Sequence, residues 1–290
     1  MLQNVVEQYG TLRAHSKPVE LAWQMGGDLI GLSPIDPWRE FGRMFAQHPD
    51  LQHSTLAYHN HFHSAEAVLS GAHLAALEFG GNSAYAPILM FAMLCHDIAH
   101  TGKTNSYDYE LETQAVNAMR AFITPNMQQF WNDHLQSTHG TLKNLLNTVE
   151  TIVLGTDFKN GPKLNRSNYQ LNAQSNPLHQ LCMLANEADI LPSIILETGV
   201  PRGHWVGEES NNPAVGSWKG RAFFLSQLAV CESHASKSMG LQEHIDAQVA
   251  AIGALGAEFL DANDVEHGWE SSVQLVQQHM HIPSKRMKVS

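Results

Sequence analysis

The stretch YAPILMFAMLCHDIAH, residues 85 to 100, is apolar on nearly every side and restricts the fold of the whole chain. A helix without a polar face is buried at the centre of a domain, because no side of it can face water. Pro87 lies near its start, where a helix tolerates proline, and Gly102 follows its end. The stretch therefore predicts a central, buried helix.

Helical periodicity extends through the rest of the chain. Apolar residues step by three and four along one face between residues 65 and 79, and similar spacing recurs at 142–153, 178–188, 223–231 and 241–259. No convincing run of alternating strand residues and no Asn-Gly hairpin is present. The sequence predicts an all-α protein, a multi-helix bundle with residues 1–290 in a single domain.

Two polar segments interrupt the helical pattern. Residues 157–177 and 199–219 are rich in Asn, Gly and Pro. Loops of this length inside a compact domain are usually functional or mobile. We predict long loops at both positions.

Composition narrows the partners and the compartment. With 17 basic and 28 acidic residues the net charge is −11, which argues against a nucleic-acid or anionic-membrane partner but leaves a small anionic substrate open if a metal supplies positive charge. No secretory signal and no run of about 18 apolar residues is found. Cys95, Cys182 and Cys231 lie far apart in apolar segments, as expected for buried thiols of a cytoplasmic protein.

Histidine is the residue in excess, with 18 in the chain. The stretch YHNHFHSAEAV, residues 58 to 68, contains three of them in five positions. The helical period that follows places His59 and His63, four residues apart, on one face of a helix and turns His61 away. Each histidine alone is most simply a surface or hydrogen-bonded core residue, so their combination with other groups carries the argument.

Those other groups are charged residues in apolar surroundings. His96 and Asp97 end the central helix, and His100 follows one turn later, on the same face if the helix continues. Asp189 lies on an apolar stripe between Ala188 and Ile190. Buried charges need compensation, which a metal ion or a hydrogen-bonded His–Asp couple can supply.

Taken together, two imidazoles and two carboxylates on predicted helices suit a nitrogen and oxygen site for zinc, manganese or iron. A carboxylate such as Asp97 can also bridge to a second, harder ion that keeps its waters.

Four motifs in order resemble the class I cyclic-nucleotide phosphodiesterases, the catalytic branch of the HD-domain superfamily. They are YHNHFHSAEAV, HDIAHTGKTN, VETIVLGTD and NEADI, within a match from about residue 55 to residue 235. The resemblance implies an all-helical catalytic core over that range, flanked by helices at both ends, with a metal site in a central pocket. It also implies a metal-dependent phosphodiesterase acting on 3′,5′-cyclic nucleotides.

Carried over by motif, the resemblance assigns His63, His96, Asp97 and Asp189 as ligands of the first metal, usually Zn²⁺ in the family. Asp97 would bridge to a second ion, Mg²⁺ or Mn²⁺. A hydroxide between the ions would attack phosphorus and His59 would protonate the leaving 3′-oxygen. The remaining matches are His100 and His139 as supporting histidines, with Tyr58 and Asn60 supporting the pocket and the His59 turn.

Departures from the family pattern concern the substrate. Arg221 stands three residues before Phe224, where the family has a purine-reading glutamine, and Gln227 is an alternative in another register. We therefore predict substrate contacts from Tyr58, Arg221, Phe224 and Gln227, with the base preference open. Pro192 replaces a family asparagine, and Gln136 aligns with a family glutamate near the bridging hydroxide.

Three alternatives remain at this stage. Arg221 and Pro192 favour a phosphohydrolase acting on a different, non-cyclic or atypical nucleotide or phosphoester. Gln136 favours a metal-binding regulatory protein without catalysis. A di-iron oxygenase on the same scaffold is the third.

Overall fold

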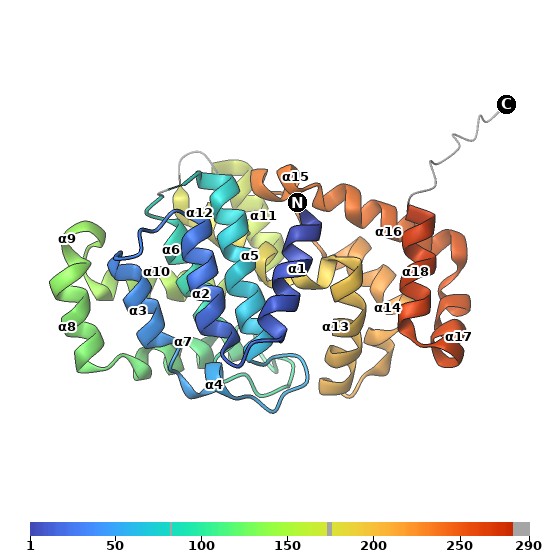
Figure 1. Cartoon of the computed structure of the whole chain (residues 1–290), viewed down its shortest axis with the longest axis horizontal. Coiled ribbons are helices and arrows are strands. Elements are labelled where there is room, and N and C mark those ends of the chain that lie inside the picture. The colour runs from blue at the N-terminus through green and yellow to red at the C-terminus, as the bar shows by residue number, and fades with distance from the viewer. Residues whose placement is uncertain (82, 173–175, 281–290) are drawn as a thin grey trace. The chain divides into compact units, whose positions relative to one another are not determined.

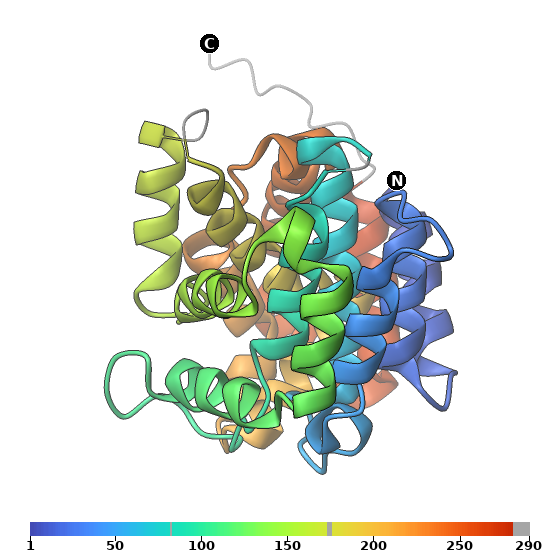
Figure 2. The same cartoon turned by 90° about the vertical axis from the view of Figure 1, so that its left-hand side faces the viewer.

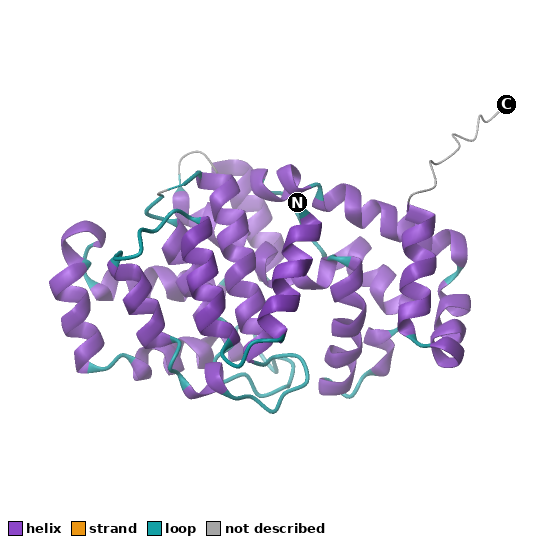
Figure 3. Ribbon diagram, in the orientation of Figure 1, coloured by secondary structure: helices purple, strands orange, loops and turns teal. Residues whose placement is uncertain are grey.

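The computed structural model describes residues 1–81, 83–172 and 176–280 and contains only helices and loops in those ranges (Figure 3). The all-α prediction is confirmed. No helix among these residues is both long and apolar enough to cross a lipid bilayer.

Packing divides the chain into two compact units. The first comprises Met1–Pro192 with Val230–Met239, and the second comprises Ser193–Ala229 with Gly240 onward. The sequence shows no linker at any of the three boundaries, so the single domain remains a prediction. Each unit is described separately.

In the first unit, α5 and α6 form the centre. Helices α1 and α2 pack along α5, which itself packs against α6 (Figures 1 and 2). Helix α10 contacts both α6 and α7, and α3 contacts α8. The helices of this unit are α1 (Leu2–Arg13), α2 (Pro18–Leu29), α3 (Pro37–Phe45), α4 (Pro49–Gln52), α5 (His61–Phe79), α6 (Ala86–Cys95), α7 (Glu110–Phe122), α8 (Pro125–His134), α9 (Gln136–His139), α10 (Leu142–Leu154), α11 (Gly161–Asn172), α12 (Pro177–Ile194, counted here to Pro192) and α15 (His234–Met239).

Helix α6 is the predicted central helix. Every residue from Leu89 to Cys95 is fully buried, and Pro87 lies in its first turn. Phe91 packs against Phe41 and Phe45 of α3, with ring centroids 5.3 and 4.8 Å apart. Apolar faces on every side of α6 therefore fix it in the core, and its end is fixed with it.

Both predicted long loops are largely helical. Residues 161–172 form α11, and 173–175 lie outside the described residues. Asn165 of α11 is buried and serves as a packing group, because its amide donates to the carbonyls of Gly155 and Cys182, at 2.9 and 3.3 Å. The Asn165 side chain, which suggested a loop, instead forms hydrogen bonds to neighbouring parts of the chain. The spacing of apolar residues cannot reveal such polar contacts.

The second unit contains α13 (Leu196–Glu209), η1 (Pro213–Gly216), α14 (Trp218–Phe223), the π-helix η2 (Phe224–Leu228), α16 (Leu241–Leu255), α17 (Ala257–His267) and α18 (Trp269–Met280). Helix α13 covers half of the second predicted loop. Its Gly199 allows close packing, because a Cβ atom there would lie 2.1 Å from the Ser193 carbonyl oxygen. Gly256, at φ 89°, separates α16 from α17 where one longer helical pattern was predicted.

Candidate metal centre

Asn60 starts α5 and thereby fixes His63 in its first turn. The Asn60 side-chain oxygen accepts hydrogen bonds from the backbone N–H groups of Phe62 and His63, at 2.9 and 3.3 Å. Its amide nitrogen donates to the carbonyls of Leu56 and Ala57. Asparagine is a preferred N-cap residue for this reason. The helix therefore begins at His61, and the prediction that His59 and His63 share a helical face is wrong.

His96 is held in one tautomer at the end of α6. Its Nδ1 atom lies 2.8 Å from the Met93 carbonyl oxygen, which can only accept a hydrogen bond. Nδ1 therefore carries the proton, and the lone pair of neutral His96 is on Nε2. Histidines that bind metals are commonly fixed by such a contact on the second ring nitrogen.

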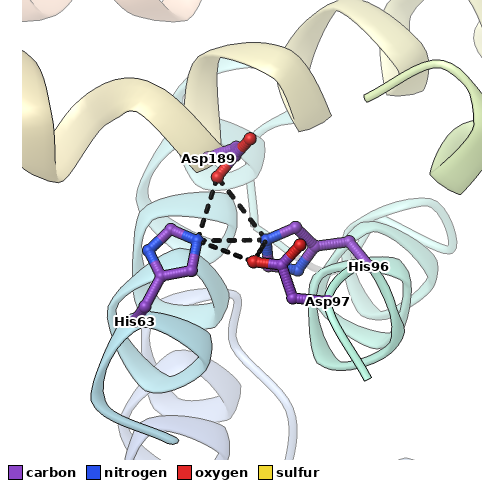
Figure 4. Close-up of side chains that lie close together, drawn as sticks. All are labelled: His63, His96, Asp97 and Asp189. Carbon is purple, nitrogen blue, oxygen red and sulfur yellow. Dashed lines mark hydrogen bonds and ion pairs between the residues drawn. The ribbon is translucent and has the colours of Figure 1, made fainter. Parts of the chain in front are cut away.

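Figure 4 shows that His63, His96, Asp97 and Asp189 converge from α5, the end of α6 and α12. The His63 Nε2 atom lies 3.0 Å from Asp97 Oδ2 and 3.1 Å from Asp189 Oδ1. The His96 Nε2 atom lies 3.1 and 3.5 Å from the same two oxygens, and 3.3 Å from His63 Nε2. These four predicted ligands form one cluster.

The spacing fits a metal ion. Four ligands placed tetrahedrally at 2.0–2.1 Å from Zn²⁺ are about 3.3 Å apart, and the distances that involve the two histidine nitrogens run from 3.0 to 3.5 Å. All four ligand atoms lie within 4.8 Å of one another. The imidazoles of His63 and His96 are each 2% exposed, whereas the carboxylates of Asp97 and Asp189 are 16% and 24% exposed. A ligand can therefore approach the cluster from the carboxylate side.

Without a metal, the cluster favours protonated histidines beside ionised aspartates. Burial would lower the pKa of His63, but Asp189 and Asp97 raise it to about 9. The pKa of His96 is likewise raised by the two carboxylates against burial. Burial would raise the pKa values of Asp97 and Asp189, but the neighbouring histidines lower both. Two carboxylates that hold positive charge between them can bind a divalent ion instead, with release of protons.

A second group shares Asp97. The metal-binding atoms of His59, Asp97 and His100 lie within 4.8 Å of one another. The His59 and His100 rings stack, with centroids 3.7 Å apart and planes at 25°. His100 Nδ1 accepts a hydrogen bond from the Gly102 N–H at 3.0 Å, so Nε2 of neutral His100 carries a proton and donates. Neutral His100 would therefore offer no lone pair on Nε2 to a second ion, whereas Asp97 belongs to both groups.

His100 reaches His59 by a turn that sequence reasoning did not foresee. Helix α6 ends at Cys95, and Ala99 has a left-handed φ of 62°, so His100 does not continue the face of His96. Tyr58 packs against His59 and His63, with ring centroids 4.7 and 4.6 Å apart.

His61 lies outside both clusters. Its pKa is lowered by burial and by the charges of His53 and Arg13, which places it in other surroundings. The alternation of three histidines in this stretch therefore contains one that does not face the centre.

Glu112 is a nearby carboxylate that the sequence did not single out. It accepts a hydrogen bond from the Asn105 amide at 2.9 Å. Burial and the charges of Asp157 and Asp97 raise its pKa. Gln136, where the motif alignment expected the equivalent of a carboxylate, is exposed in α9. Glu112 lies in the first turn of α7 and belongs to no motif singled out in the sequence, and only its position eight residues beyond the HDIAHTGKT stretch hints at a role.

His139 has a structural environment. Its Nε2 atom accepts a hydrogen bond from the Trp38 indole N–H at 3.2 Å, and its ring packs edge-on against Trp38 at 5.4 Å. Trp131 completes this aromatic cluster. A supporting role for His139 at the metal centre is therefore not borne out by its contacts.

The other predicted substrate contacts belong to the second unit. Arg221 is buried, donates to the carbonyls of Ser193 and Ile194 and to Gln248 Oε1, and has its pKa lowered to about 9 by burial. Phe224 is half-buried at the start of the π-helix, and Gln227 is exposed. Their contact with a substrate remains a prediction.

Comparisons with known proteins connect this chain to a fold. No family model matches the sequence, and no curated protein matches it. The structure is similar to the phosphodiesterase domain of the RhoPDE fusion protein from the choanoflagellate Salpingoeca rosetta, with a TM-score of 0.59 and 15% identity, over 91% of this chain and 92% of that one. A second structure, the phosphodiesterase domain of Salpingoeca rosetta rhodopsin phosphodiesterase, matches with a TM-score of 0.63 and 15% identity, over 87% and 90%. The chain thus has the all-helical fold of these phosphodiesterase domains.

Proposed function

We propose that this protein is a metal-dependent phosphodiesterase that opens a 3′,5′-cyclic nucleotide to a 5′-monophosphate. The observation that carries the proposal is the His63–His96–Asp97–Asp189 cluster, whose ligand atoms are spaced for one metal ion and which stands beside His59 and His100. The similarity to phosphodiesterase domains supports the same reaction class.

The cluster would hold Zn²⁺, and Asp97 would share its carboxylate with Mg²⁺ or Mn²⁺. Bound divalent ions at such a pair of sites activate water and neutralise charge on phosphoryl oxygens. His63 and His96 would bind the ion through the lone pair on Nε2 of the neutral imidazole. The hydrogen bond from His96 Nδ1 to the Met93 carbonyl keeps the lone pair of His96 on Nε2. The chain's own contribution is thus a preformed ligand set.

His59 would act as the general acid. It lies beside Asp97 and stacks on His100, outside the four-residue cluster, so its ring is near the reacting group without being needed as a ligand. An imidazolium can give a proton to a leaving alkoxide near neutral pH. His100, whose Nε2 donates, and Glu112 would orient water around the centre.

Substrate recognition in the first unit would involve Tyr58 beside the cluster. Phe224 and Gln227 stay contacts that the motif resemblance alone predicts. The Arg221 guanidinium donates hydrogen bonds to two backbone carbonyls and to Gln248 within its own unit. Its role would therefore be structural rather than recognition of a base. The base preference therefore does not follow from Arg221.

Hydrolysis of cAMP and cGMP with Zn²⁺ and Mn²⁺ or Mg²⁺ present tests the proposal. We expect the 5′-monophosphate as product and a loss of about 10²–10⁴-fold in kcat for His59→Ala, as for removal of a general acid. His61→Ala is the matched control, because His61 lies in the same stretch but outside both clusters, and should keep most activity. No turnover of either nucleotide by fully metallated protein would refute the cyclic-nucleotide assignment.

A phosphoester other than a cyclic nucleotide is the second candidate. It is favoured by the commitment of Arg221 to internal hydrogen bonds where the family has a purine-reading glutamine. A panel of nucleotide monoesters and aryl phosphodiesters distinguishes the two. Activity confined to cAMP and cGMP rejects this candidate, and no turnover of any ester in the panel by fully metallated protein would instead favour a metal-binding protein without catalysis.

A further inference from the structure

Two residues in the segment after α6 have a backbone conformation that is rare for them. Ala99 and Tyr109 have φ values of 62° and 63°. Residues with a Cβ atom are disfavoured in this left-handed region, and only Gly, Asn and Asp visit it readily. The two residues bracket the loop 100–108, which contains His100 and Asn105. Some feature of the fold must hold the chain in this conformation.

Each of the two residues gives its backbone N–H to a carboxylate from another part of the chain. The Ala99 N–H donates to Asp50 Oδ2 at 2.9 Å, and the Tyr109 N–H donates to Asp157 Oδ2 at 2.9 Å. The third left-handed non-glycine residue in the described chain, Asn211, gives its N–H to the Glu208 carbonyl instead. Among these three left-handed residues, only the two in the segment after His96 and Asp97 donate to a carboxylate.

The two carboxylates are held to different degrees. Asp157 is 1% exposed, and its Oδ1 accepts from the N–H groups of Lys159 and Asn160. Asp157 Oδ2 accepts from the Asn105 amide as well, at 3.0 Å. Asp50 lies in the short helix α4 with its side chain 46% exposed, and its Oδ2 is held by the Ala99 N–H. The Asp157 end of the segment is therefore the more firmly fixed.

The groups held by these contacts are those of the metal centre. Ala99 directly precedes His100 and follows Asp97 by two residues, so its φ angle sets the direction in which His100 leaves the end of α6. The Asn105 amide donates one hydrogen bond to Asp157 and another to Glu112. The charge of Asp97 contributes to the raised pKa of Glu112. Loss of the Asp50 contact would move His100, and loss of the Asp157 contact would move Asn105 and Glu112.

We infer that Asp50 and Asp157 are positioning residues, a pair of carboxylates that clamp the segment from Asp97 to Tyr109 in the conformation that builds the metal centre. Neither touches the ligand atoms of the cluster. The inference rests on the proposed function only for its kinetic readout, because the clamp acts on the ligand Asp97 whether or not a substrate binds.

Titration of metal-free protein with Co²⁺ tests the clamp without a substrate, because the visible spectrum of Co²⁺ depends on its ligand geometry. We expect Asp50→Ala to weaken Co²⁺ binding about tenfold, as for other residues that orient ligands, and to alter the spectrum. Asp133→Ala, at an exposed position on α8, is the control and should match the parent. Parental affinity and spectrum in Asp50→Ala would overturn the inference.

Ala99→Gly in the Asp50→Ala background separates clamping from a general loss of stability. Glycine adopts a φ of 62° without a Cβ clash, so the segment should need the carboxylate less. We expect the double variant to regain most of the Co²⁺ affinity and the parental spectrum, whereas Asn211→Gly in the same background restores neither. If Ala99→Gly alone binds like the parent but fails to rescue Asp50→Ala, the clamp is disproved.

Asp157→Asn provides the other end of the test. It keeps the volume of the buried side chain but replaces one acceptor oxygen by a donor, and circular dichroism establishes that it folds. A weakened Co²⁺ site in folded Asp157→Asn supports the clamp, and a parental site opposes it. With a phosphoester substrate, a lower kcat at unchanged KM should accompany Asp50→Ala and be reversed by Ala99→Gly. Absence of all turnover would count against the proposed function, while the Co²⁺ results would still decide the clamp.

Discussion

Asp97 connects most of what surrounds the metal centre. Its Oδ2 atom lies 3.0 Å from His63 Nε2 and 3.1 Å from His96 Nε2, and its carboxylate also belongs to the group with His59 and His100. An acidic residue at the end of a buried helix is costly unless several cations or donors share it. The same feature made Asp97 recognisable from the sequence.

Removal of His63 should abolish the stabilisation of the protein by its first metal. Saturation at a hundred times Kd stabilises a folded protein by about 2.7 kcal/mol, so Zn²⁺ should raise the unfolding temperature of the parent. In His63→Ala the cluster loses one of its two imidazoles, and the Zn²⁺-dependent shift should largely disappear. His61→Ala should retain it. Calorimetry with and without Zn²⁺ measures both, and a parental shift in His63→Ala would contradict the ligand assignment.

Three residues of the cluster stand out in the sequence because each is a polar group within or at the end of an apolar helix: His96, Asp97 and Asp189. His63 is singled out by the motif resemblance instead. Glu112, Asp50 and Asp157 are not anomalous in that way. Asp50 meets Ala99 from 49 positions away, and Asp157 meets Tyr109 from 48 positions away. No local pattern encodes contacts of that separation, so they appear only in the fold.

Helices in the first unit approach one another closely at glycine. A Cβ atom at Gly42 of α3 would lie 1.9 Å from Cε2 of Trp23 in α2, whereas one at Gly10 of α1 would meet nothing within 4 Å. The two helices α2 and α3 are in contact because position 42 lacks a side chain. Glycine in a helix interior otherwise weakens it relative to alanine.

Gly42→Ala and Gly10→Ala should therefore shift stability in opposite directions. Overpacking of a filled core costs about 1–3 kcal/mol, so Gly42→Ala should lower the free energy of unfolding by at least that much. Gly10→Ala should raise it by about 0.5–1 kcal/mol through helix propensity alone. Urea denaturation of both variants gives the comparison. Equal effects at the two positions would mean that the α2–α3 contact is not limited by space.

Close packing through glycine and asparagine also accounts for the two helices, α11 and α13, that the sequence pattern predicted as loops. Asn and Gly in α11 and α13 were interpreted as loop residues, but Asn165 bonds backbone carbonyls of neighbouring helices and Gly199 admits the Ser193 carbonyl. Helices α6 and α10, by contrast, bury continuous apolar faces and were identified correctly. Apolar packing leaves a periodic record in the sequence, and polar packing does not.

At the scale of the whole molecule, buried neutral histidines make the fold sensitive to acid. His73 in α5 is 8% exposed, its Nε2 atom lies 2.6 Å from Gln8 Oε1, and burial lowers its pKa to about 4. The pKa values of His48 and His244 are also lowered, with burial as the largest cause. A folded state that binds protons less readily than the unfolded chain loses stability as protons become available.

The contribution of His73 has a defined pH window. Its folded pKa of about 4 lies below the unfolded value of about 6.5, so the stabilisation is complete above the unfolded value and is lost as the pH falls toward 4. Between pH 7 and pH 5 the loss should be about 2 kcal/mol. His73→Gln removes the titration and should flatten the dependence of unfolding free energy on pH by that amount. An unchanged slope between pH 7 and pH 5 would show that His73 is protonated in the folded protein.

The proposed metal ligands are spread from residue 63 to residue 189. Bringing such distant positions together requires closing long chain loops, which is entropically unfavourable until the packed helices supply compensating contacts. A partly folded chain that lacks α12 has no complete ligand set. If the cluster binds its ion, metal capture during refolding should therefore be a late event limited by helix docking, and its rate should not depend on the concentration of free metal once the ion is in excess.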